Sequence, residues 1–246
     1  MPPAHVHFAP WSLPLPPMLA LAGIMVLYLW LFHRLPSLKI AAFLGGLSAA
    51  WLAIASPLVA LDHQLLTFHM VKHLLLMTAA APLILLGLPK PRSVNWSGCS
   101  LALCWLAGTA TVIAWHVPAI FQLALQSQTW HNIENASFLV AGVLFWWPVM
   151  QSQSETTQPW AVPLYLFLGT MPCDALSAFL TFCGRVVYPA YAVTPGNFHL
   201  TPLEDQEFAG ALMWVAVTFI YLIPAVVMTI RILSPEPQYT QIRVPT

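Results

Sequence analysis

The chain has 246 residues, of which 8 are Lys or Arg and 8 are Asp or Glu, so its formal net charge is zero. Charged residues make up 7% of the chain and hydrophobic residues 59%, whereas soluble domains carry roughly 25% charged residues. So few charges cannot cover the surface of a soluble domain, and no Lys/Arg cluster is present to neutralise nucleic-acid phosphates. The composition therefore excludes both classes and predicts an integral membrane protein.

A membrane-spanning helix needs about 20 mostly apolar residues, and the sequence contains seven such stretches. They cover approximately 17–35, 40–59, 65–88, 99–123, 131–150, 160–182 and 208–233. The connections are short, and no internal repeat or linker is visible. We expect one all-α domain over residues 1–246, a bundle of seven transmembrane helices with tails at 1–16 and 234–246. Because no basic residue precedes 17–35, this stretch is interpreted as a retained span and not a cleaved signal peptide.

The distribution of basic residues predicts the orientation in the membrane, because cytoplasmic connections carry an excess of Lys and Arg. In the connections and at the ends of the spans, one side of the membrane has only Arg185. The other side has six basic residues: Arg34, Lys39, Lys90, Arg92, Arg231 and Arg243. The N-terminal tail is therefore expected outside and the C-terminal tail in the cytoplasm.

On this topology, eight of the nine histidines lie on the outer side of the membrane, and only His33 lies at the inner boundary. His69 and His73 are four residues apart in the third span, so their side chains share one helix face. Met77 continues that face and Met70 lies beside it. The remaining outer histidines divide into solvated positions and candidate ligands; we expect solvent exposure for His5, His7, His63 and His199.

Further residues of ligand type lie at the same predicted depth on other spans. His116 ends the fourth span, His131 and Glu134 are one turn apart at the start of the fifth, and Asp205 caps the entrance to the seventh. Imidazoles, carboxylates and thioethers together suit a transition metal, copper above all. The alternatives are hydrogen bonding between helices for the histidines and core packing for the methionines. The predicted metal set is His69, His73, His116, His131, Glu134, Asp205, Met70 and Met77.

Two other charged residues lie inside predicted spans, Lys72 in the third and Asp174 in the sixth. A charge within the bilayer needs a partner, and the two residues lie at similar depth. We therefore expect a structural ion pair between Lys72 and Asp174. A proton or ion relay through the same two residues is the alternative.

The segments around these positions form a series of short motifs. They include His69-Met70-Val71-Lys72-His73, Trp115-His116-Val117-Pro118, Phe145-Trp146-Trp147-Pro148, Tyr188-Pro189-Ala190-Tyr191 and Pro202-Leu203-Glu204-Asp205-Gln206. From about Ser56 to Trp214, the series resembles the multi-span CtaG family of cytochrome c oxidase assembly factors. That family was first associated with the caa-type oxidases of Bacillus, and it is distinct from the single-span copper chaperone of the same name.

The resemblance implies a multi-pass protein of the bacterial inner membrane that helps to mature a haem-copper oxidase of the respiratory chain. It implies a metallochaperone role, in which copper is supplied to the catalytic subunit of the oxidase. The family pattern often has His where this chain has Asn135, and Asp near Cys183-Gly184. The family's histidines and acidic residues fall on positions already selected: His69, His73, His116, His131, Glu134 and Asp205.

The leading interpretation is an accessory protein that binds copper, with a periplasmic copper chaperone as candidate donor, and passes the ion to the oxidase by ligand exchange. A haem-binding redox protein with axial histidines is one alternative, although no C-x-x-C-H motif is present. A copper or proton transporter using Lys72 and Asp174 is another, although no inverted repeat is visible. The sequence has no H-E-x-x-H or G-x-S-x-G motif and no recognisable nucleophile–base pair, so no enzyme is expected.

Reporter fusions after Pro91 and after Thr246 test the predicted orientation. Both are expected to report a cytoplasmic location, because the basic residues next to these positions favour retention on that side. A periplasmic signal from either fusion would contradict the orientation.

Overall fold

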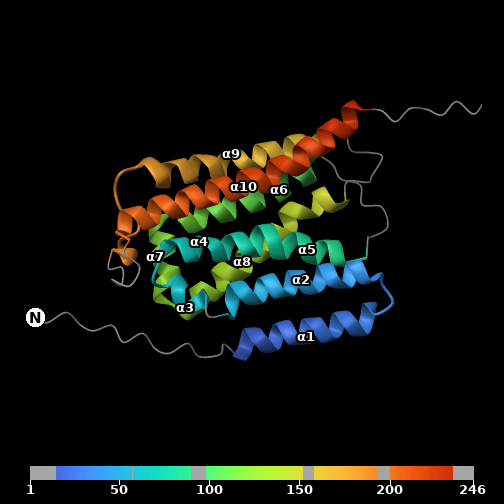
Figure 1. Cartoon of the computed structure of the whole chain (residues 1–246), viewed down its shortest axis with the longest axis horizontal. Helices are drawn as coiled ribbons and strands as arrows, with labels where there is room; N and C mark the ends of the chain where they lie inside the picture. Colours follow the sequence, from blue (N-terminus) through green and yellow to red (C-terminus); the bar gives the residue numbers. More distant parts are fainter. Residues whose placement is uncertain (1–14, 57, 90–97, 152–157, 193–199, 235–246) are drawn as a thin grey trace, which may run out of the picture.

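The computed structural model of the protein describes residues 15–56, 58–89, 98–151, 158–192 and 200–234. Within these ranges every regular element is a helix (Figure 1). Six helices are long and apolar enough to cross a membrane, or seven spans are present if one bent pair of helices counts as a span. The expected all-α membrane fold is confirmed, whereas the orientation of the termini stays a prediction.

The long helices run up and down the bundle in alternate directions (Figure 1). α1 lies at one edge and packs chiefly on α2, while α9 and α10 pack along each other on the opposite side. In chain order the elements are α1 (Leu15–Phe32), α2 (Ser37–Ile54), α3 (Leu58–Asp62), α4 (Leu66–Leu74), η1 (Leu75–Ala80), α5 (Ala81–Gly87), α6 (Gly98–His116), α7 (Pro118–Gln126), α8 (Gln128–Gln151), α9 (Ala161–Phe182), η2 (Pro189–Tyr191) and α10 (Pro202–Leu233).

The span predicted at 99–123 is bent and not straight. α6 ends at His116, α7 begins at Pro118, and the two helix axes differ by 76°. Val117 has an extended backbone, with φ −66° and ψ 122°, because the ring of a following proline disfavours the helical conformation. As a result α7 turns across one end of the bundle, which we call the α7 end (Figure 1).

The seventh span begins at Pro202, earlier than the predicted start at 208. The Thr201 side chain accepts a hydrogen bond from the Glu204 amide, and the Glu204 side chain accepts one from the Thr201 amide. This capping box, followed by a proline at the first helical position, is a helix start signal that outweighs the polar character of the turn.

The third span contains a π-helical segment, η1, between α4 and α5. The Ala81 amide donates to the Leu76 carbonyl, five residues back. In the same register the Met77 carbonyl would accept from residue 82, but Pro82 has no N–H to donate. The indole Nε1 of Trp146 on α8 donates to that carbonyl at 3.0 Å. The π segment therefore supplies a fixed contact between the third span and α8.

Gly142 allows α8 to approach the third span closely at the same level. A Cβ atom at this position would lie 2.9 Å from the Met77 Cα and 2.9 Å from the Ala81 Cβ. Because α8 and α4 run in the same direction, this contact fixes the register of the two helices two turns away as well. That is where His131 and Glu134 on α8 face the histidines of α4.

Asp205 on α10 caps the first turn of α4 from outside that helix. Its Oδ2 accepts from the Leu66 amide at 2.7 Å, and its Oδ1 accepts from the Thr67 amide at 3.2 Å and the Thr67 hydroxyl at 2.7 Å. Helix N-termini favour a negative charge, which compensates for its burial. The sequence placed Asp205 at the entrance to its own span, but the structure shows that it caps the start of α4.

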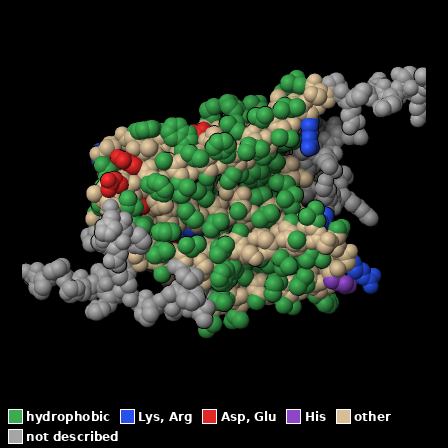
Figure 2. Space-filling model, in the orientation of Figure 1, with side chains coloured by type: hydrophobic (Ala, Val, Ile, Leu, Met, Phe, Trp, Pro, Cys, Tyr) green, Lys and Arg blue, Asp and Glu red, His purple; other side chains and the backbone are tan. Residues whose placement is uncertain are grey.

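The outside of the bundle is apolar and its charges lie mostly at its two ends. Figure 2 shows hydrophobic side chains over the visible face, with most Lys and Arg at one end and most Asp and Glu at the other. Trp30 on α1 is 73% exposed and Phe219 on α10 is 61% exposed. Such a surface is compatible with lipid contact along the helices.

Replacing Gly142 by alanine tests the close approach of α8 to η1. We expect Gly142→Ala to destabilise the protein by about 1–3 kcal/mol, because the new methyl group overlaps backbone atoms that cannot move independently. Gly23→Ala on α1 is the matched control, since no atom lies within 4 Å of the added Cβ there. Thermal unfolding in detergent measures both, and equal stability of the two variants would contradict the proposed contact.

Candidate metal centre

A cluster of buried ionisable side chains lies inside the bundle towards the α7 end. Its members come from α3, α4 and α8, and each exposes at most 5% of its surface. α3 packs on α4, and α8 packs on η1 and α5, which continue the same span, so side chains from the three elements meet. The members are Asp62, His69, Lys72, His73, His131 and Glu134.

Three of these residues, His69, His73 and Glu134, form what we call the buried triad. The Nε2 atoms of the two histidines are 2.8 Å apart, and Glu134 Oε1 lies 3.3 Å from each of them. A first-row metal ion lies about 2 Å from such donors, which places its ligands roughly 3–3.5 Å from one another. The three atoms therefore already have nearly the separations that a shared metal ion requires.

Glu134 is fully buried, and within the described residues neither of its carboxylate oxygens accepts a hydrogen bond. Its Oε2 is 3.6 Å from His131 Nδ1 and 3.8 Å from Lys72 Nζ. A buried carboxylate without hydrogen bonds is costly, because burial removes the water that would solvate it. The side chain therefore has unused capacity to bind a cation.

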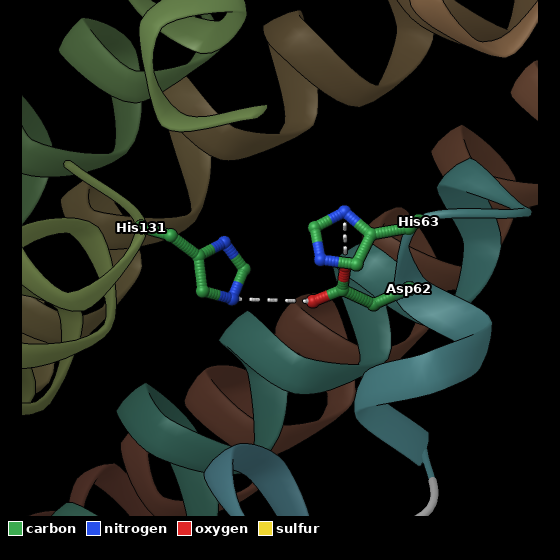
Figure 3. A group of neighbouring side chains, drawn as sticks. All are labelled: Asp62, His63 and His131. Carbon is green, nitrogen blue, oxygen red and sulfur yellow. Dashed lines mark ion pairs between the residues drawn. The ribbon is translucent and has the colours of Figure 1, made fainter. Parts of the chain in front are cut away.

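Three ligand-type residues, Asp62, His63 and His131, form a second group, the surface triad, whose candidate ligand atoms all lie within 4.8 Å of one another. Figure 3 shows the two imidazoles next to the carboxylate, with His131 Nε2 3.6 Å from Asp62 Oδ2 and His63 Nδ1 3.6 Å from Asp62 Oδ1. The His63 side chain is 47% exposed. The group thus connects the cluster to the molecular surface.

Lys72 lies between the two triads. Its Nζ donates to Asp62 Oδ2 at 2.6 Å and lies 3.4 Å from His131 Nε2. Burial alone would raise the pKa of the Asp62 carboxyl, but the Lys72 ammonium and the His69 ring outweigh burial and hold that pKa well below its usual range. Asp62 is therefore the ionised partner of Lys72.

The predicted Lys72–Asp174 pair is wrong. Asp174 accepts a hydrogen bond from the Thr218 hydroxyl at 3.1 Å, whereas Lys72 pairs with Asp62. Similar depth in the membrane does not determine which way a side chain points around its helix. Lys72 points towards α3 and α8, and Asp174 points from α9 towards α10.

Asp62 is a candidate site residue that the sequence analysis missed. It ends α3, a short helix in a connection that was expected to be solvated. The Asp62-His63 dipeptide beside a span rich in histidines was the available signal. The Tyr191 hydroxyl also donates to the Asp62 carbonyl at 2.8 Å, which helps to hold this connection over the cluster.

The other predicted ligands divide between different environments. His116 Nδ1 lies 2.7 Å from the Val112 carbonyl oxygen, and its Nε2 lies 3.3 Å from Met70 Sδ. Met70, Met77, His73 and His116 all line one cavity of about 40 Å³. The thioethers and His116 thus adjoin the buried triad across a small cavity and do not belong to it. Asp205 is not part of either triad, because both of its oxygens cap α4.

The two positions that differ from the expected family pattern lie in different settings. Asn135 is buried beside the cluster, and its Oδ1 has no hydrogen-bond partner within the described residues. Cys183 accepts from the Gln206 amide at 3.3 Å in a turn where Gly184 has φ +64°. Of the histidines expected to be solvated, His63 lies in the surface triad, and His5, His7 and His199 lie outside the described residues.

Comparison with known proteins gives one match. The sequence model of a family described as cytochrome c oxidase caa3 assembly factor (Caa3_CtaG) matches residues 22–234. No curated protein and no solved structure gives a significant match. The matched range includes every residue of both triads, and it is most of the chain.

Charge neutralisation at Lys72 tests the observed ion pair. Lys72→Met should lower the free energy of unfolding by about 3–5 kcal/mol, because it leaves two buried carboxylates without their ammonium. Adding Asp62→Asn should restore part of that loss. Asp174→Asn, the matched control, should show no coupling to Lys72→Met. Double-mutant cycles on thermal unfolding in detergent measure both couplings, and a larger coupling to Asp174 would contradict the structure.

Proposed function

The chain belongs to the cytochrome c oxidase caa3 assembly factor family, and on this premise we propose that it binds a copper ion in the buried triad and supplies it to the oxidase catalytic subunit. Its role is then that of a metallochaperone in the membrane, accessory and not enzymatic. The ion is cargo, and the residues of the triad are the ligands that release it.

The observation that carries this proposal is the charge balance around Glu134. Two buried carboxylates, those of Asp62 and Glu134, face one ammonium, that of Lys72. Histidine binds a metal through a neutral ring, so the cluster with neutral histidines has one uncompensated negative charge. A buried charge of this kind requires a counter-ion. A monovalent cation between Glu134 and the two histidines would restore neutrality.

The donor atoms support copper as the cargo. Imidazole nitrogen suits Cu, Zn, Fe or Ni, and thioether sulfur selects Cu(I). Met70 and Met77 line the cavity that adjoins His73. A haem-copper oxidase needs copper in its catalytic subunit, and the charge of Cu(I) matches the deficit of the cluster. Cu(I) therefore has both the single positive charge that would neutralise the cluster and the preference for soft thioether ligands.

The position of the cluster supports exchange with partners at one face of the membrane. It lies towards the α7 end of the bundle, which is the outer face on the predicted topology. There the ion would come from a periplasmic copper chaperone and leave by ligand exchange to the oxidase subunit in the same bacterial inner membrane. The apolar outer surface of the bundle would hold this protein in the same lipid bilayer as the oxidase subunit.

The alternative functions receive less support from the geometry. A haem would need histidines from facing helices as ligands, but the cavity that His73 and His116 line has a volume of about 40 Å³, which does not accommodate a haem. A relay through Lys72 and Asp174 lacks its central contact, because Lys72 pairs with Asp62.

Substitutions in the buried triad test the copper proposal. His73→Ala and Glu134→Gln should each lower Cu(I) affinity at least about tenfold, since each removes a donor from a three-donor site. His33→Ala, exposed at the opposite end, and Glu207→Gln on α10 are the matched controls and should bind Cu(I) normally. Competition with a chromophoric Cu(I) chelator measures affinity, and X-ray absorption counts nitrogen and sulfur ligands.

In cells, either triad variant should yield an oxidase that contains haem but lacks copper in its catalytic subunit. Full copper occupancy in both variants, at normal protein levels, would refute the copper proposal.

A further inference from the structure

The surface triad differs from the buried triad in its access to the outside. His63 is the exposed member, at 47% of its side chain, while Asp62 and His131 are buried. An ion that enters the bundle at the α7 end could meet these three ligands before it reaches His69 and His73. Among the described residues, only this group combines an exposed imidazole with buried ligand atoms.

The two triads are contiguous. Asp62 Oδ1 accepts no hydrogen bond from the described part of the chain, and it lies 3.6 Å from His63 Nδ1 and 4.0 Å from His69 Nδ1. His131 faces Asp62 with one ring nitrogen and Glu134 with the other, each at 3.6 Å. An ion can therefore exchange ligands from one triad to the other without crossing an apolar layer.

Lys72 is a counter-ion within reach of both carboxylates. Its ammonium is 2.6 Å from Asp62 Oδ2 and 3.8 Å from Glu134 Oε2. In this structure it donates to Asp62 and lies near the outer limit of ion-pair distance from Glu134. A small rotation of the flexible lysine stem would bring the same ammonium onto Glu134 and leave Asp62 free.

We propose that the surface triad is a second cation position, where Cu(I) binds on its way to the buried triad. Because of Lys72, only one of the two positions holds an ion at a time. This inference rests on the proposed function of the buried triad. With the ion in the surface triad, Lys72 neutralises Glu134. As the ion moves to His69, His73 and Glu134, Lys72 returns to Asp62.

Charge explains why only one position is filled at a time. One monovalent ion and one ammonium neutralise two carboxylates in either arrangement, so the two arrangements have the same net charge. A second ion would leave an excess positive charge in a low-dielectric interior, which is strongly unfavourable. The protein is therefore expected to bind one Cu(I) per chain, with the buried triad as the tighter position.

The role of His63 can be tested by comparing its substitution in two backgrounds. In the otherwise unchanged protein, His63→Ala should slow the rate of Cu(I) loading, because it removes the exposed ligand of the surface triad. In His73→Ala, where the ion can bind only at the surface triad, adding His63→Ala should lower affinity by a further factor of about ten or more. His33→Ala should have no effect in either background.

The outcomes separate this inference from the proposed function. If His73→Ala binds Cu(I) as tightly as the unchanged protein, the proposed function fails. If His73→Ala is weakened but His63→Ala adds nothing to it, only the second position fails. If His63→Ala alone weakens binding as much as His73→Ala does, the two triads act as one site and the alternation fails.

The role of Lys72 predicts a change in stoichiometry. Without the ammonium, two Cu(I) ions are needed to neutralise Asp62 and Glu134, so Lys72→Met should bind two ions per chain where the unchanged protein binds one. Copper analysis of protein purified with Cu(I) measures this ratio, and a ratio of one would overturn the counter-ion role. Should this variant not accumulate, the His63 series, which keeps Lys72, decides the existence of the second position.

Discussion

Neutralisation of buried carboxylates is the constraint on which the interior of this bundle depends, because lipid around the helices offers no water to solvate them. Three carboxylates near the α7 end meet the constraint differently. Asp205 is stabilised by two amides at the start of α4 and by the Thr67 hydroxyl. Asp62 is stabilised by Lys72. Among the described residues, Glu134 has only histidine nitrogens and the Lys72 ammonium at 3.8 Å near it, so its charge is the least compensated of the three.

The helix scaffold places Glu134 in this environment through contacts that lie elsewhere. Pro82 prevents one backbone hydrogen bond in the third span, and the free Met77 carbonyl binds the Trp146 indole. Gly142 lets α8 approach the same turn, so the two helices are fixed side by side. Two turns away, the register of α8 brings Glu134 to His69 and His73 on α4. The geometry of the candidate metal centre thus follows from backbone features of residues outside the two triads.

Hydropathy and helical periodicity were sufficient to predict the membrane fold, the approximate spans and the shared face of His69 and His73. They could not predict direction around a helix axis for residues on different spans, which is why Lys72 was assigned to Asp174. They also could not show that the connection before α4 folds inward and supplies Asp62. Asp205 was predicted to cap the entrance to its own span, whereas its carboxylate caps α4. Capping of one helix by another leaves no local pattern in the sequence.

The same charges that attract an ion to the cluster also limit how tightly the ion is held. A structural zinc site is closed by four ligands and retains its metal, whereas the buried triad offers three donors next to a small cavity. Lys72 lies 3.8 Å from the carboxylate that would bind the ion, and two positive charges at such a distance repel each other appreciably in a low dielectric. An ammonium that competes for the carboxylate ligand would weaken the binding of a permanent metal cofactor. For the proposed role of copper carrier, that competition is an advantage, because the ammonium can neutralise Glu134 as the ion departs.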